Sequence, residues 1–183
     1  MKCCWDVETQ RLSSEVPGGW GAIDKFGLAI ACVEDLDSGE MWKFREDDVA
    51  ALVTVLIEAE LVVGFNSVDF DSRVIEPYYR KLASPADQPL AKRLRHLDIF
   101  QEAKQITGEW PSLEKMARAN LGRGKTGDGL QAVALYKAQR FDELEAYCGE
   151  DVKLTADLWR LGQKQKFLMV PAKKGPKRMV VNW

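Results

Sequence analysis

The order of apolar patterns along the chain is the strongest constraint on its fold. Residues 2–8 (KCCWDVE) predict a short, half-buried first strand. Residues 26–35 and 41–44 flank the turn at residues 37–39 and predict two antiparallel strands. The continuous apolar run LVVGFN at residues 61–66 is typical of a buried parallel strand, and residues 95–100 (RHLDIF) predict another short strand.

Helical patterns fill most of the remaining chain. The apolar residues of 46–59 recur at helical spacing, and a helix is expected over about 70–82, bent or broken at Pro77. Further helices are expected over residues 101–106, 112–120, 129–138 and 141–161, and the last residues predict a short strand at 179–183. Strands first, then alternation, then helices predict an α/β or α+β domain with a mixed sheet. We take the α/β class, with a sheet of five or six strands flanked by helices, which is what the family resemblance given below implies.

Composition limits the class of protein. The 183 residues suit one domain, and 46% hydrophobic with 30% charged residues is a globular balance. No apolar run approaches the roughly 20 residues that span a bilayer, and Asp6 falls where a signal peptide would be apolar. The four cysteines form no C-x-x-C pair. We therefore expect a cytoplasmic protein with reduced, mostly buried thiols and no membrane partner.

Charge is unevenly distributed. All 28 acidic residues precede position 160, together with 19 of the 26 basic ones, so residues 1–159 carry −9 and the remainder +7. This asymmetry fits an acidic, metal-binding body with a basic strip for phosphates. A tail that only improves solubility is the alternative.

Three segments carry candidate carboxylates. Asp6 and Glu8 lie two apart on the first strand, so both side chains leave the same face. Two buried carboxylates there would repel each other without a cation, unless one of them lies at a solvated strand end. Asp71 lies just beyond the end of the expected parallel strand, where open α/β sheets build their sites. Asp69 and Asp71 could instead cap a helix.

The third segment is the late helix. Tyr147 and Asp151 are spaced i, i+4, so they are neighbours on one helical face. Asn66, in the turn before Asp71, could bond either the turn itself or a substrate phosphate.

Together these motifs resemble the DEDDy 3′–5′ exonucleases of the ribonuclease H-like superfamily. The YprB-type ribonuclease H-like group is a closer resemblance, through LVVGFNSVDFDSRVI, HLDIF, PSLEKMARANLG, GKTGDG and YCGEDVKLTADLW, and it extends from residue 2 to about 162. The resemblance implies that Asp6, Glu8, Asp71 and Asp151 bind two Mg²⁺ or Mn²⁺ ions, with Tyr147 orienting the attacking water. In the histidine branch, a histidine would replace Ala146, and the single histidine, His96, lies far upstream.

Several other residues are candidates for the site, but the patterns that indicate them are less specific. Thr9 would support the terminal nucleotide, Asp98 would lie beside the metal ligands, and Arg123 and Lys125 could contact the substrate backbone. Phe70 and Trp20 could stack against a base, although such aromatics are also common in cores.

The sequence thus predicts a metal-dependent 3′–5′ exonuclease acting on single-stranded DNA or RNA 3′ ends. Residues 1–162 would form the ribonuclease H-like exonuclease domain and residues 163–183 a basic C-terminal extension. A structure-specific endonuclease and a non-catalytic nucleic-acid-binding module are the alternatives. A helicase or polymerase could be a partner.

Overall fold

A mixed five-stranded sheet forms the centre of the protein. The computed structural model describes residues 1–124 and 129–183. The strands follow the order β3-β2-β1-β4-β5, where β2 pairs antiparallel with β1 and β3, and β4 pairs parallel with β1 and β5. Their bounds are β1 Lys2–Thr9, β2 Leu28–Asp35, β3 Met41–Phe44, β4 Leu61–Gly64 and β5 His96–Asp98. The predicted fold class is confirmed.

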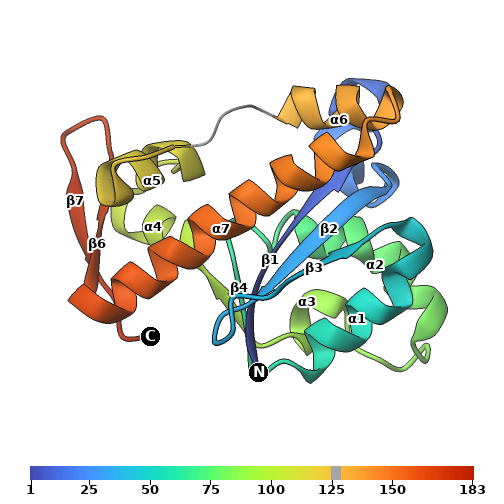
Figure 1. The fold of residues 1–183 in the computed structure, drawn as a ribbon, viewed down its shortest axis with the longest axis horizontal. Coiled ribbons are helices and arrows are strands. Elements are labelled where there is room, and N and C mark those ends of the chain that lie inside the picture. Colours follow the sequence, from blue (N-terminus) through green and yellow to red (C-terminus); the bar gives the residue numbers. More distant parts are fainter. Residues whose placement is uncertain (125–128) are drawn as a thin grey trace.

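Helices cover both faces of this sheet (Figure 1). The long α7 and the shorter α5 pack on one face, and α1 and α2 pack on the other, which gives two separate apolar cores. The helices are α1 Val49–Glu58, α2 Asp71–Leu82, α3 Leu90–Arg93, α4 Ile99–Thr107, α5 Leu113–Leu121, α6 Gly129–Lys137 and α7 Phe141–Gln165. None of the helices in the described part of the chain is long and apolar enough to cross a membrane.

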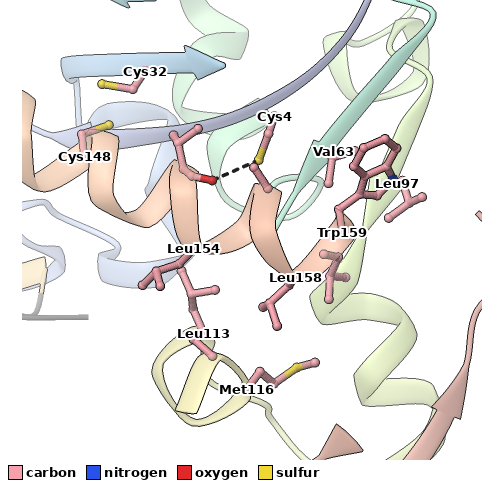
Figure 2. Packing of buried hydrophobic residues seen from close by; sticks show 14 of the residues in the cluster. Cys4, Cys32, Val63, Leu97, Leu113, Met116, Cys148, Leu154, Leu158 and Trp159 are labelled. Atoms are coloured by element: carbon pink, nitrogen blue, oxygen red, sulfur yellow. Dashed lines mark hydrogen bonds between the residues drawn. The ribbon is translucent and has the colours of Figure 1, made fainter. Parts of the chain in front are cut away.

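The core under α7 contains three of the four cysteines. Figure 2 shows Cys4 of β1, Cys32 of β2 and Cys148 of α7 among aliphatic side chains. The Cys4 thiol donates to the carbonyl of Val152 at 3.5 Å, which ties β1 to α7. All four cysteines are buried free thiols, as expected.

Several element boundaries differ from the sequence-based expectations. β5 ends at Asp98 because the carboxylate of that residue accepts the N–H groups of Phe100 and Gln101 and caps α4. Pro77 lies inside α2, which continues through it. Two 3-10 helices that were not predicted form between β1 and β2, η1 Ser13–Glu15 and η2 Gly19–Lys25. A third, η3 Glu46–Asp48, precedes α1.

The C-terminal residues form a hairpin. β6 Phe167–Val170 was not predicted, and β7 Lys177–Val180 lies slightly before the strand expected at 179–183. Their buried side chains join the core beneath α7; these are Leu168, Val170, Met179 and Val181. α7 itself continues to Gln165, so the domain boundary at residue 162 remains a prediction.

Candidate active site

The central strand β1 carries two of the candidate carboxylates. Along its second half, half-buried Asp6 and Glu8 alternate with buried Val7 and Thr9. Asp6 and Glu8 therefore leave the same face of the strand. This is the face on which α7 packs, because β1 and β2 both contact that helix. The expectation of a shared face is confirmed.

The helix α7 brings the third carboxylate to this face. Asp151 is buried, and carboxylate oxygens of Asp6, Glu8 and Asp151 all lie within 4.8 Å of one another. Tyr147, one helical turn earlier, is also buried and lines the same cavity. Three carboxylates this close repel one another strongly in a partly desolvated site, so the arrangement favours a bound cation.

Asp71 lies in the same cavity but outside that group of three. It is the first residue of α2, and its Oδ1 accepts the backbone N–H of Val7 at 2.8 Å. Burial raises the pKa of Asp71 to about 7; the N–H groups of Val7 and of Asp71 itself lower it, and Asp98 and Asp151 raise it. Because Val7 stands between Asp6 and Glu8, this bond fixes Asp71 beside both of them.

Asp98 holds the turn that leads to Asp71. Its two carboxylate oxygens accept the N–H groups of Asn66 and Val68, at 2.8 and 3.0 Å, in addition to capping α4. Asn66 has a positive φ of 67°, a backbone conformation that asparagine tolerates better than most residues. Asn66 thus shapes the turn and is not among the residues lining the carboxylate cavity.

The carboxylates open into a cavity of about 420 Å³. One wall is aromatic: the rings of Trp20, Phe26 and Phe70 lie 5.8 to 6.3 Å apart, and Trp20 is 66% exposed. The exposed Leu130 of α6 also lines the cavity. Apolar walls beside carboxylates are suited to a ligand with a flat apolar part and with an anionic part that a cation bridges to the carboxylates.

The remaining predicted site residues occupy different places. Thr9 lines the cavity and donates through Oγ1 to the carbonyl of Arg11 at 3.0 Å, and Phe70 belongs to the aromatic wall. Arg123 forms an ion pair with Asp157 on α7. Lys125 lies outside the described residues.

Some lining residues were missed by sequence reasoning. Arg11 lines the cavity, and its guanidinium also donates to the carbonyl of Lys25 at 2.7 Å. The Cys148 thiol donates to the carbonyl of Asp6 at 3.5 Å and lies 4.0 Å from its Oδ2. Burial, followed by the neighbouring Cys32, raises the pKa of this thiol, so it stays protonated. The sequence contained one indication that Cys148 lies near the site, because it directly follows Tyr147 in the motif YCGEDVKLTADLW.

A hard divalent cation fits this donor set. Asp6, Glu8 and Asp151 offer only oxygen atoms, which Mg²⁺ and Mn²⁺ prefer. Asp71 is fixed in the same cavity, so four carboxylates line one space.

Comparisons with known proteins agree with this arrangement. A family model for the RNase H superfamily matches residues 3–161. The chain therefore belongs to the RNase H superfamily. No curated protein matches the sequence significantly.

Among solved structures, the chain is similar to the family B DNA polymerase from the hyperthermophilic archaeon Pyrobaculum calidifontis. The TM-score is 0.62 and the identity 17%, over 88% of this chain and 24% of the polymerase chain. At that identity the likeness concerns the fold, and this chain corresponds to about a quarter of the polymerase's length. Superfamily membership supports a nuclease, that is, a hydrolase with a nucleic-acid substrate, and such enzymes generally use divalent metal ions.

Proposed function

We propose that the protein is a 3′–5′ exonuclease of the DEDDy type that hydrolyses DNA or RNA from the 3′ end. The observation that carries this proposal is the grouping of Asp6, Glu8 and Asp151 within 4.8 Å, in a cavity that Tyr147 and Asp71 also line. Four carboxylates and a tyrosine from three distant segments converge there, as the resemblance to DEDDy enzymes implies.

The carboxylates would hold two Mg²⁺ or Mn²⁺ ions. Asp6, Glu8 and Asp151 supply the grouped oxygens, and Asp71 supplies the oxygen that Val7 does not engage. Two such ions provide the charge that activates water and stabilises the leaving 3′ oxygen. Val7 and Cys148 then act as supports, because each donates a hydrogen bond to one of the ligand residues.

The other lining residues fit the roles of positioning groups. Tyr147, one turn from Asp151, lines the cavity and would orient the attacking water through its hydroxyl. Arg11 would neutralise a phosphate of the strand. Trp20, Phe70 and Leu130, which all line the cavity, would provide apolar contacts for an unstacked terminal base.

The experiment uses 5′-labelled single-stranded DNA and RNA oligonucleotides with Mn²⁺ or Mg²⁺. An exonuclease shortens them stepwise from the 3′ end and leaves a circular single strand intact, whereas an endonuclease cuts the circle. Asp6→Ala and Asp151→Asn should each lower the rate of cleavage at least a hundredfold, and EDTA should have the same effect. The matched control is Asp142→Asn, an exposed carboxylate in the first turn of α7. A binding module would shift the labelled strand in a gel and leave it whole with every metal, and intact substrates throughout would overturn the proposal.

A further inference from the structure

A second surface, outside the carboxylate cavity, combines an exposed aromatic ring with several lysines. Trp110 lies in the segment between α4 and α5 and is 75% exposed, the most exposed of the large apolar side chains in the described ranges. It borders a cavity of about 480 Å³ between this segment and the residues that follow β6. Most of the indole surface of Trp110 is therefore open to contact with a ligand.

The charges around Trp110 favour an anion. Lys104 places its ammonium 3.8 Å from the centre of the indole ring, and Lys115 and Lys173 line the same cavity. The acidic residue there, Glu109, uses both carboxylate oxygens to accept the backbone N–H of Lys173, at 3.1 Å each. Three lysines against one internally bonded carboxylate leave a positive surface beside a flat ring. This is the composition of single-stranded nucleic-acid sites, where bases stack on aromatic rings and lysines follow the backbone.

A short series of aromatic rings links this surface to the carboxylate cavity. Phe65, which lines the cavity, lies 5.7 Å from Phe100, and Phe100 lies 5.5 Å from Trp110. Phe65 directly follows β4, and Phe100 lies two residues after β5. Both parallel strands therefore end on the edge of the sheet that carries the candidate active site. Trp110 is thus within the reach of a strand whose 3′ end lies among the carboxylates.

We infer that Trp110, with Lys104, Lys115 and Lys173, binds an unpaired base and the adjoining phosphates of the substrate strand, a few nucleotides before its 3′ end. The inference rests on the proposed function and deepens it, because stacking on Trp110 requires a base that is free of a duplex partner. The enzyme should therefore act on single-stranded DNA or RNA, or on single-stranded 3′ overhangs, in preference to blunt duplex ends.

Strand length provides the test. Fluorescence anisotropy would compare a labelled 12-mer and a labelled trimer of oligothymidylate, with EDTA present so that both remain whole. Trp110→Ala should weaken binding of the 12-mer about tenfold and leave the trimer unchanged, since the trimer is too short to occupy both sites. Trp110→Phe, which keeps a stacking ring, should retain most of the affinity. Leu82→Ala, at a 54% exposed position on the opposite layer, is the control for lost apolar surface.

The lysines give a separate readout. Lys115→Ala and Lys173→Ala should each reduce the dependence of 12-mer binding on salt, by about 0.7 in the slope of log K against log salt. Equal affinity of Trp110→Ala and wild-type protein for the 12-mer would overturn the inference.

Cleavage assays separate this inference from the proposed function. If the wild-type protein shortens oligonucleotides with Mn²⁺ while Trp110→Ala binds the 12-mer normally, the exonuclease proposal stands and the inference is wrong. If Trp110→Ala weakens binding but no metal supports cleavage, the strand-binding surface stands and the exonuclease proposal is wrong.

Discussion

The backbone N–H of Val7 donates a 2.8 Å hydrogen bond to Oδ1 of Asp71, which links the centre of β1 to the first residue of α2. The two residues are 64 positions apart, and the bond lies between Asp6 and Glu8 on the same strand. It fixes the carboxylate of one candidate metal ligand to the backbone that carries the two others. It also leaves one oxygen of Asp71 for a cation.

This relationship separates the structural role of Asp71 from its proposed role in metal binding. Asp71→Asn keeps an oxygen that can accept the Val7 N–H and removes a buried charge, so it should fold with undiminished stability yet lose cleavage by at least a hundredfold. Asp71→Ala leaves the buried N–H without its acceptor and should lose about 1–3 kcal/mol of unfolding free energy. Urea unfolding and oligonucleotide cleavage measure the two effects.

The control for these variants is Asp69→Asn. Asp69 is exposed, lies two residues away and contacts Gln101 at 3.4 Å, so its loss should alter neither property. If Asp71→Asn cleaves normally, Asp71 is not a metal ligand.

Repulsion among the grouped carboxylates predicts stabilisation by metal. Mn²⁺ should raise the melting temperature of the wild-type protein, because it neutralises Asp6, Glu8 and Asp151 together and binds only the folded state. Asp151→Asn should melt higher than wild type in EDTA and respond little to Mn²⁺, whereas the control Asp142→Asn should respond like wild type. Calorimetry with and without Mn²⁺ measures this. An equal Mn²⁺ response in Asp151→Asn would place the metal elsewhere.

Sequence patterns were enough to predict the sheet, and the resemblance to DEDDy enzymes grouped the four carboxylates with Tyr147, all of which line one cavity. The alternation of residues 2–9 and the i, i+4 spacing of Tyr147 and Asp151 on α7 are local patterns, and the folded protein keeps both. The Val7–Asp71 bond has no such signal, because its partners meet only after β1 and α2 pack together. η1 and η2 were not predicted, because glycines such as Gly18 and Gly19 are typical of turns. Arg11 and Trp20, in the same part of the chain, line the cavity.

The C-terminal hairpin was partly missed for a similar reason. β6 is only four residues long, directly follows α7, and gains its pairing partner from residues 177–180 across a loop rich in proline and lysine. Nothing in its own four residues distinguishes it from a continuation of the helix.

Trp183, which follows the hairpin, packs against Gly162 of α7, and we expect this contact to stabilise the domain. A Cβ on Gly162 would lie 2.4 Å from a ring carbon of Trp183, whose Nε1 donates to Glu102 at 2.7 Å. Gly162→Ala should therefore cost about 1–3 kcal/mol through overpacking, although alanine favours the helix itself. In a Trp183→Ala background the same change should be neutral or stabilising by up to about 1 kcal/mol. A urea-unfolding double-mutant cycle measures the difference. A stabilising effect of Gly162→Ala in the wild-type background would contradict the contact.

Burial of the single histidine predicts a loss of stability in acid. His96 lies on β5, with Nε2 3.5 Å from the Ser72 hydroxyl, and burial lowers its pKa to about 4. A histidine whose pKa is lower in the folded state than its unfolded value of about 6.5 binds a proton less readily when the protein is folded. Its contribution to the free energy of unfolding is therefore fully present above pH 6.5 and is lost as the pH falls toward 4. The full effect is up to about 3 kcal/mol. The raised pKa values of Asp71 and Asp98 act in the opposite direction, because protonation of these buried carboxyls favours the folded state.

The variant His96→Gln isolates the histidine from these carboxyls. Both proteins share Asp71 and Asp98, so their influence cancels when the unfolding free energies of wild type and variant are subtracted at each pH. The wild-type protein should lose about 2–3 kcal/mol more than His96→Gln between pH 7 and pH 4. Urea unfolding in EDTA across this range measures the difference without interference from metal binding. Parallel pH profiles for the two proteins would show that His96 takes up its proton as readily in the folded state as in the unfolded one.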